Sequence, residues 1–364
     1  MTATDKIASE SQQMDQQSIV VSGGEFIANP KSAPKVGADG KPILDASILI
    51  VSWNVKDMLR DCLNSLRKNA GDVSYDVIVV DNASKDGSQE MIRTEFPWVK
   101  FVNPNANLGF GRGNNLAFKY ATGRWTLLLN PDTVVLDRAI EKIITFADAN
   151  PEAGAVGGRT LKADMTLERS CCWGSPGLWP LVCKSVGLHL MFKKSKLLNS
   201  EAMDWWQRDS IRDVDVITGC FLMIRKDIYE KTGGFDDRFF MYAEEVDLCW
   251  RIRKMGWRLM FCPQAQIIHL VGASAAKAKP NRVYQINLGL LKLFKKHYGE
   301  AYAKFANFLM LMFYATRVPL MKAGLGLGII SNKDTVAKAE VYRQTMYRHV
   351  RLFRREYQSE IDKA

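Results

Sequence analysis

The stretch that decides the fold is SILIVSW at residues 47–53, followed after one helical segment by DVIVVDN at 76–82. Both are short, almost continuously apolar runs of the kind that form buried strands. Met58, Cys62 and Leu66 mark the segment between them at the four-residue spacing of an amphipathic helix. A strand, a helix and a strand of these lengths form a βαβ unit, whose two strands lie parallel in one sheet.

The same alternation continues along the chain. Further strands are expected at 99–102, 125–130, 258–262 and 266–270, and further helices at about 86–96, 113–121 and 243–255. The prediction is an α/β fold, Rossmann-like, with a mostly parallel sheet and flanking helices. In such sheets a ligand binds outside the carboxyl ends of the strands. The polar residues that follow the predicted strands are Asn54, Asp81, Asn82, Asn130 and Asp132.

Asp81 closes the second strand in VIVVDNASKDGS. A carboxylate at a strand end, followed by small residues, can accept hydrogen bonds from a base or a ribose. An Asp-Asn pair also serves simply as a turn.

The segment NANLGFGRGNN at 105–115 resembles a phosphate-binding loop. It is not the dinucleotide fingerprint, because two strands have already passed and Asn114 stands where the third glycine is required. A hydride-transfer enzyme is therefore disfavoured. The loop is expected to line a sugar or nucleotide pocket through Asn107, Arg112 and Asn114.

LLLNPDT at 127–133 places Asn130 and Asp132 two residues apart, just after a buried strand. Two oxygen ligands at this spacing can share a divalent cation that is bound to a diphosphate. The alternative is an ordinary turn in which Asp132 is a cap. His269 ends the strand QIIHL; it is a hydrogen-bonded core residue unless Asp132 holds a metal, which a neutral imidazole could then also bind.

MYAEEVDLCWR at 241–251 places Glu244, Glu245 and Asp247 at the start of a helix. Clustered carboxylates repel each other, so one of them can have a raised pKa and act as a general base. The alternative is that acids favour a first helical turn, and that Asp247 pairs with Arg251 four residues on.

The positive charge is concentrated in one part of the chain. Its 364 residues include 50 Lys and Arg against 39 Asp and Glu, yet residues 1–276 are neutral and 277–364 hold 17 basic and 6 acidic side chains. Such a block binds phosphates of nucleic acid or of anionic lipids, or is a solvated helical face. We predict three parts: a disordered arm at 1–45, the α/β domain at 46–276 and a basic helical tail at 277–364. Seven unpaired cysteines and the lack of a secretory signal favour the cytoplasm.

Two apolar stretches are open to more than one interpretation. Residues 178–192, LWPLVCKSVGLHLMF, lie in a segment from 160 to 213 that is either a lid or membrane contact, or a buried connection. The apolar run at 305–316 is too short to span a bilayer. The last helix is amphipathic and predicts a membrane interface or a helix packed on the domain; its apolar positions are Ala339, Tyr342, Met346, Val350, Phe353 and Tyr357, and Arg343, Arg348, Arg351, Arg354 and Arg355 surround them.

Taken in this order, the segments resemble family 2 glycosyltransferases of the GT-A fold, and within them the bacterial branch with cell-surface rhamnosyltransferases. The matching pieces span about 48–274; they are ILIVSWN, VIVVDNASKDGS, NLGFGRGNN, LLLNPDT, VITGCFLMIRKDIYEKTGGFDDRFFMYAEEVDLCWR and IIHLVGAS. Where the family usually has a second carboxylate, two residues before the metal aspartate, this chain has Asn130. Where the family has Glu-Asp or Asp-Asp, it has Glu244-Glu245.

The resemblance implies roles for individual residues. It implies a Mg²⁺ or Mn²⁺ ion at Asp132 and His269, and Glu245 as the catalytic base with Glu244 in reserve. Gly219 and Asp247 fall on the acceptor side. The donor-binding residues it implies are Ser52, Asn54, Asp81, Asn82, Asn107, Gly109, Arg112, Asn114 and Asn130.

The function implied is an inverting transfer of a sugar from a nucleotide-sugar to a hydroxyl of a lipid-linked glycan, in cell-surface polysaccharide synthesis. The favoured donor is dTDP-rhamnose, and UDP-hexose or UDP-N-acetylhexosamine donors stay open. The acceptor would carry a polyprenyl diphosphate, and the tail would hold the enzyme peripherally on the inner face of the cell membrane. A non-catalytic nucleotide-sugar-binding or scaffold protein is the alternative of another class. Nucleic acid is not expected as a partner, because the tail's aromatic residues have core-like helical spacing.

Overall fold

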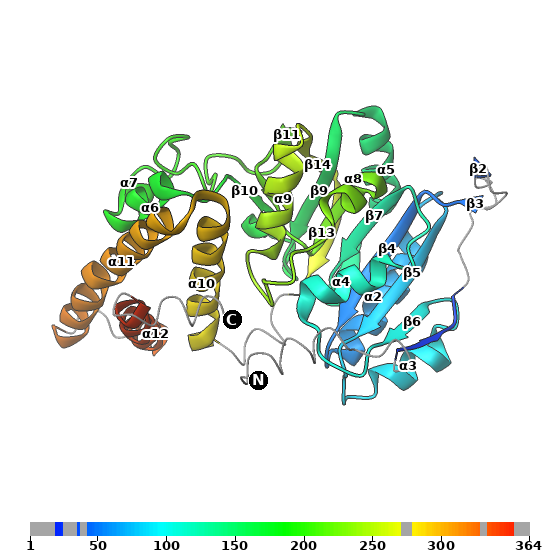
Figure 1. Ribbon diagram of the computed structural model, residues 1–364, viewed down its shortest axis with the longest axis horizontal. Coiled ribbons are helices and arrows are strands. Elements are labelled where there is room, and N and C mark those ends of the chain that lie inside the picture. The colour runs from blue at the N-terminus through cyan, green and yellow to red at the C-terminus, as the bar shows by residue number, and fades with distance from the viewer. Residues whose placement is uncertain (1–18, 25–34, 37–41, 271–278, 328–332, 353–364) are drawn as a thin grey trace, which may run out of the picture.

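The structure, a computed structural model, describes residues 19–24, 35–36, 42–270, 279–327 and 333–352. Within them the largest unit is a ten-stranded sheet with the order β1-β6-β5-β4-β7-β13-β9-β14-β11, and β8 pairs with β14 (Figure 1). Its strands are β1 (Val20–Ser22), β4 (Ala46–Ser52), β5 (Tyr75–Asp81), β6 (Lys100–Asn103), β7 (Trp125–Leu129), β8 (Thr133–Val135), β9 (Ala153–Leu161), β11 (Arg212–Asp213), β13 (Phe221–Arg225) and β14 (Arg258–His269). The short strands β2 (Lys35–Val36) and β3 (Pro42–Ile43) pair separately.

The middle of the sheet is parallel, as the sequence predicts. β4 pairs in parallel with β5 and with β7, and β5 with β6. Successive side chains of a strand point to opposite faces, so Leu49 and Ile78 join one apolar core and Ile48 and Val77 the other. Because both faces are covered, these strands have continuous rather than alternating apolar sequences.

Helices cover both faces of the sheet. The core on one face includes residues of α2 (Lys56–Asn69), α3 (Ser88–Glu95) and α5 (Ala139–Ala149). The core on the other face includes residues of α4 (Gly109–Phe118), α8 (Lys226–Thr232) and α9 (Glu244–Lys254). All carboxyl ends of the parallel strands lie at one edge, which we call the carboxyl edge.

Most of the glycine segment is helical, and its helix starts about four residues earlier than the predicted helix at 113–121. Helix α4 begins at Gly109, and its glycines are buried. A Cβ atom on Gly113 would lie 2.8 Å from Val51 Cγ1, and one on Gly111 would lie 3.1 Å from Phe235 Cβ. The glycines therefore allow α4 to approach β4 and the chain around Phe235 closely.

Part of the predicted arm belongs to the sheet. Val20, Val21 and Ser22 form β1, which pairs antiparallel with the edge strand β6. Val20 and Val21 are exposed, so backbone hydrogen bonds rather than an apolar pattern hold this strand, and periodicity could not reveal it. Residues 1–18, 25–34 and 37–41 of the predicted arm lie outside the described residues.

The segment from 160 to 213 does not form a lid over the ends of β4 and β5. It contains a 3-10 turn, the strand β10 (Cys172–Trp173), which pairs with β12 (Val216–Ile217), and the helices α6 (Leu178–Ser185) and α7 (Leu188–Met191). Figure 1 shows α6 and α7 beside α11, on the side of the molecule away from β4 and β5.

The C-terminal helices are α10 (Lys279–Tyr298), α11 (Glu300–Gly326) and α12 (Lys333–Arg351). None of the described helices is long and apolar enough to cross a membrane. Helix α12 does not present its apolar side outward, because Tyr342 packs on Phe313 and Tyr314, and His349 is buried. It is a helix packed on its neighbours; the predicted continuation through 353–357 lies outside the described part of the chain.

A buried carboxylate joins α10 to α9. Asp247 Oδ2 accepts a hydrogen bond from Arg251 Nε at 2.8 Å, and Oδ1 lies 2.5 Å from Lys296 Nζ and 2.8 Å from His297 Nε2. Burial acts to raise the pKa of Asp247, but these partners outweigh it and hold the pKa below its usual value. The expected Asp247–Arg251 pair is thus present, both oxygens of Asp247 have partners within the protein, and its role on the acceptor side stays a prediction.

Removing this carboxylate is expected to destabilise the protein strongly. Asp247→Ala removes the carboxylate shared by Arg251, Lys296 and His297 and leaves Lys296 with Asp236 as its counter-charge, and breaking such a buried network costs about 3 kcal/mol or more. The exposed Asp57, which pairs with Arg60, is the control, and Asp57→Ala should cost no more than about 1 kcal/mol. Urea unfolding at neutral pH measures both, and equal midpoints for the two variants would contradict the assignment.

Candidate active site

Two buried oxygens without partners mark the carboxyl edge at β4 and β5. Ser52 and Asp81 are the last residues of these strands, stand opposite each other in register and are fully buried. Asp81 Oδ1 accepts hydrogen bonds from Ser84 N at 2.8 Å and Gln89 Nε2 at 3.0 Å. Asp81 Oδ2 and Ser52 Oγ have no partner. Buried polar atoms are almost always paired, so both are candidates for contacts to a ligand.

Several of the residues predicted to bind the donor form hydrogen bonds with backbone groups of the neighbouring loops. Asn54 Oδ1 accepts from Lys85 N at 2.7 Å, and Asn107 Oδ1 accepts from Gly109 N at 2.9 Å. Asn82 Nδ2 donates to Gly109 O at 3.0 Å, which ties the end of β5 to the start of α4. These amides fix the loops that end at the carboxyl edge.

The remaining predicted donor residues belong to α4. Asn114 Nδ2 donates to Phe110 O within the helix, and Arg112 Nη2 donates to Asp237 O at 2.9 Å. Gly109, with φ at +76°, packs closely on Phe240. These contacts attach α4 to the chain that leads into α9; a role in donor binding stays a prediction for each residue.

Asn130, Asp132 and His269 lie together at the end of β7. Asp132 Oδ1 is 3.2 Å from His269 Nε2, and Asn130 Nδ2 is 3.3 Å from the same nitrogen. Antiparallel pairing of β8 with β14 sets His269 opposite Thr133 and so brings together residues that are 137 positions apart. The side chains of Asp132 and His269 are partly exposed, so a ligand can reach them.

This donor set fits a cation whose coordination is completed by a substrate. Asp132 offers a carboxylate, His269 an imidazole and Asn130 an amide that can present its oxygen after rotation. The described residues contain no group of three or more His, Cys, Asp or Glu side chains that could hold a metal on their own. Mg²⁺ typically takes one or two carboxylates and fills its shell with phosphate oxygens and water. Asp132 and His269 would therefore hold Mg²⁺ or Mn²⁺ together with a diphosphate.

The acid pair begins α9, and it too has buried oxygens without partners. Glu244 Oε2 and Glu245 Oε2 are buried and accept no hydrogen bond. Burial raises the pKa of both carboxyls, and the charge of Glu245 raises the pKa of Glu244 further. Because two neighbouring carboxylates repel each other, one of the pair keeps its proton to a higher pH, and the other can act as a base once it is ionised.

The loop before this pair is held by α10. Tyr242 and Ala243 both have left-handed backbones, with φ at 71° and 69°, a conformation that costs a residue other than glycine about 1 kcal/mol or more. A Cβ atom on Gly289 of α10 would lie 2.7 Å from Tyr242 O. The C-terminal helices therefore define how α9 starts, which the sequence motif at 241–251 does not show.

A short turn connects Asn130 with α9. Asn130 N donates to Cys220 O at 3.2 Å, where β13 runs beside β7. Gly219 in the same turn packs on the ring of Phe110, since a Cβ there would lie 2.8 Å from Phe110 Cζ. Just before it, Ile217 O accepts from Cys249 Sγ, one helical turn after Glu245. Gly219 thus lies between the two halves of the candidate site.

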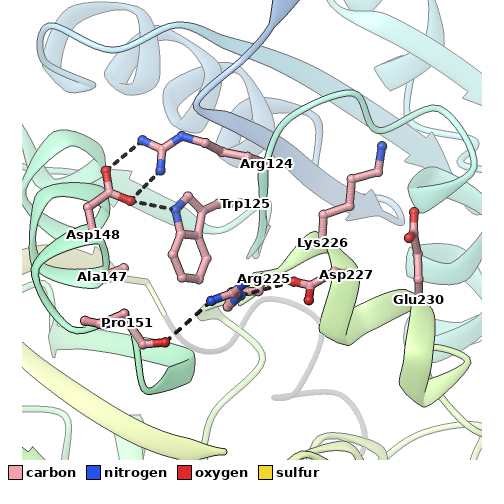
Figure 2. Close-up of a pocket in the computed structure, with 9 residues that line it drawn as sticks. All are labelled: Arg124, Trp125, Ala147, Asp148, Pro151, Arg225, Lys226, Asp227 and Glu230. Carbon is pink, nitrogen blue, oxygen red and sulfur yellow. Dashed lines mark hydrogen bonds and ion pairs between the residues drawn. The ribbon is translucent and has the colours of Figure 1, made fainter. Parts of the chain in front are cut away.

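A pocket without any predicted site residue lies at the opposite edge of the sheet. It has a volume of about 600 Å³ and lies where β7 starts, between α5 and α8 (Figure 2). Four of its charged groups are paired, because Arg124 and Trp125 bind Asp148, while Arg225 binds Asp227 and Pro151 O. This pocket has no predicted site residue, and we assign no chemistry to it.

Comparison with known proteins identifies the family. A model described as Glycosyl transferase family 2 matches residues 47–233, more than half of the chain. The chain belongs to this family. The match includes Asp81 and Asp132 and ends before Glu244, so the acid pair rests on the geometry given above.

Curated relatives of this family 2 chain include two rhamnosyltransferases. The N-acetylglucosaminyl-diphospho-decaprenol L-rhamnosyltransferase of Mycobacterium tuberculosis is 28% identical over 53% of this chain, which spans about two thirds (66%) of that relative. Rhamnosyltransferase WbbL of Escherichia coli is 28% identical over 61% of this chain and 82% of its own length.

A solved structure supports the fold. The mannosyltransferase of Pyrobaculum calidifontis in complex with GDP-Man and Mn²⁺ matches with a TM-score of 0.53 at 15% identity, over 87% of this chain and 89% of that one. The predicted GT-A fold is thus confirmed.

The raised pKa of Glu244 predicts a pH dependence of stability that needs no activity assay. An acid whose pKa is higher in the folded than in the unfolded protein destabilises the fold as pH rises above its unfolded value, about 4.3. Glu244→Gln should remove part of the fall in unfolding free energy between about pH 5 and pH 8. Chemical unfolding across this range tests it, with the exposed Glu95→Gln as control; an unchanged slope in Glu244→Gln would refute the burial of an unpaired acid.

Proposed function

We propose that this protein is an inverting glycosyltransferase that moves a sugar from a nucleotide-sugar to a hydroxyl of a lipid-linked glycan. The observation that carries the proposal is a pair of buried acids without hydrogen-bond partners at the start of α9. The turn that contains Gly219 connects α9 with the strand end where Asp132 and His269 lie together. Membership of glycosyl transferase family 2 supports the reaction class.

The residues supply the steps of a single displacement. Ser52 Oγ and Asp81 Oδ2 bind the nucleoside. Glu245 accepts the proton of the acceptor hydroxyl as that oxygen bonds to the anomeric carbon. The bond from this carbon to the diphosphate breaks, the nucleoside diphosphate leaves with the electron pair, and the configuration inverts. A divalent cation held by Asp132 and His269 would offset the negative charge that develops on the leaving group.

The favoured donor is dTDP-rhamnose and the favoured acceptor a polyprenyl-diphosphate-linked glycan. The rhamnosyl group and the lipid-linked acceptor follow the names of relatives, one of which is a rhamnosyltransferase named for N-acetylglucosaminyl-diphospho-decaprenol. The dTDP nucleotide follows from the family resemblance of the sequence. A UDP-hexose or UDP-N-acetylhexosamine donor is the alternative, since a hexosyltransferase of Haloferax volcanii is also similar, at 24% identity. Because such an acceptor resides in a bilayer, the enzyme would work peripherally on the inner face of the cell membrane.

The base assignment predicts a specific loss of turnover. Glu245→Gln should lower kcat at least about a hundredfold, the range of a general base, with little effect on nucleotide binding. In the wild type, activity should fall as pH drops through a pKa above the usual glutamate value, because the base must be ionised. Radiolabelled transfer and calorimetric binding of the nucleoside diphosphate measure the two effects, with Glu95→Gln as a surface control. Undiminished kcat in Glu245→Gln would remove Glu245 from the mechanism.

The donor assignment is tested separately. Product mass after incubation with dTDP-rhamnose and with UDP-hexoses should show transfer of a deoxyhexose only. Transfer only from a UDP-hexose would overturn the rhamnose assignment and keep the glycosyltransferase proposal.

A further inference from the structure

Helix α11 has an exposed apolar side. Phe305, Phe308 and Met312 follow one another at spacings of three and four residues, and each is 40–50% exposed. Leu320, which is 70% exposed, and Leu327 continue the exposed apolar surface toward the end of the helix. The opposite side is occupied, since Tyr314 and Val318 are buried. A side this apolar on a described helix has no protein partner among the described residues.

Helices α6 and α7 extend this surface. Arg317 of α11 donates to the carbonyl oxygens of Lys184 at 2.6 Å and Ser185 at 3.0 Å, and Ser185 Oγ donates to Leu309 O at 2.7 Å. At 100° per residue, Leu309 lies about 40° from Phe305 and about 60° from Met312, whereas Arg317 lies about 120° or more from all three exposed residues. Helix α6 therefore packs on the flank of α11 that runs from Leu309 to Arg317, next to the exposed side.

The short helices are themselves unusually apolar at their surface. Met191 is 74% exposed, Val186 65% and Leu190 57%, and Phe192 follows them. We call the exposed residues of α6, α7 and the chain to Leu197, together with the exposed side of α11, the α6–α11 face. Apolar patches of this kind mark interaction sites in soluble proteins.

The charged residues around the face indicate which kind of partner it binds. The sequence has no Asp or Glu from 178 to 200 or from 301 to 333. Lys193, Lys194, Lys196 and Lys322 are exposed at its border. An apolar surface ringed by lysines and free of acids is complementary to a bilayer with anionic headgroups, into which aromatic and aliphatic side chains insert while lysines meet phosphates.

We propose that the α6–α11 face is a monotopic membrane-docking surface that binds bilayers containing anionic lipid, with α11 lying in the interface. This goes beyond the proposed function, because it assigns membrane binding to a defined surface on α6, α7 and α11. The membrane contact that the sequence predicts for α12 is thereby moved to this surface. Since α10 also holds the loop before Glu244, docking places the acid pair near acceptors in that bilayer; only this consequence rests on the proposed function.

Vesicle flotation of the full-length protein, without donor or acceptor, tests the surface. Wild-type protein should float with vesicles of phosphatidylcholine mixed with phosphatidylglycerol, and much less with phosphatidylcholine alone. Phe305→Glu/Phe308→Glu should weaken binding by about tenfold or more, from lost apolar insertion and added negative charge. Lys193→Glu/Lys194→Glu should weaken binding only to the anionic vesicles, and the difference from wild type should shrink at high salt.

Controls separate this proposal from misfolding and from the enzymatic proposal. Met255→Glu adds a charge at an exposed methionine outside the face and should bind vesicles as wild type does. The melting temperature and the binding of the nucleoside diphosphate should stay unchanged in the face variants. Vesicle binding that is absent in the wild type, or unaffected in the Phe305→Glu/Phe308→Glu variant, would overturn the proposal. A wild-type dimer that this variant converts to a monomer, without loss of vesicle binding, would assign the face to a second copy of the chain instead.

Discussion

The arrangement of the site depends on the buried carboxylate of Asp247. It meets Arg251 on its own helix and Lys296 and His297 on α10, so α9 and α10 cannot separate without exposing or orphaning several charges. Asp247 lies on the first turn of α9, two residues after Glu245. The same contact that joins the C-terminal helices to the α/β domain therefore also fixes the position of the acid pair.

Buried oxygens without a hydrogen-bond partner occur at both edges of the sheet, because Asp76 Oδ1 and Thr126 Oγ1, near the starts of β5 and β7, lack one as well. At the carboxyl edge, Ser52 and Asp81 each keep one oxygen without a hydrogen bond, and the two glutamates at the start of α9 do the same. In the pocket at the opposite edge, Arg124 pairs with Asp148 and Arg225 with Asp227 (Figure 2). A buried polar atom without a partner therefore indicates a ligand site only together with other observations. At the carboxyl edge this further observation is the Asp132–His269 pair.

Much of the fold follows from local pattern, because strands buried on both faces and helices with one apolar side have clear periodicities. The proximity of Asp132 and His269 could also be predicted from the sequence, since both lie at the ends of strands that meet at one edge of the sheet. The start of α4 within the glycine segment could not be predicted from the sequence, because glycine is typical of loops and also of helices that pack closely on a neighbour. Here the neighbours are Val51 and Phe235. The partners of Asp247 on α10 could not be predicted either, because Lys296 and His297 lie about fifty residues further along the chain and no sequence spacing links them to Asp247. The apolar side of α12 faces the protein because Tyr342 packs on Phe313 and Tyr314 of α11. A helical-wheel projection of α12 alone cannot reveal these partners.

The most direct test is a crystal structure with a nucleoside diphosphate-sugar and Mn²⁺. The nucleoside should contact Ser52 Oγ and Asp81 Oδ2, the diphosphate should share the cation with Asp132 and His269, and Glu245 should face the anomeric carbon from the side opposite the leaving group. A donor bound in the pocket of Figure 2, or a sugar ring that Glu245 and Asp132 do not flank, would contradict the account.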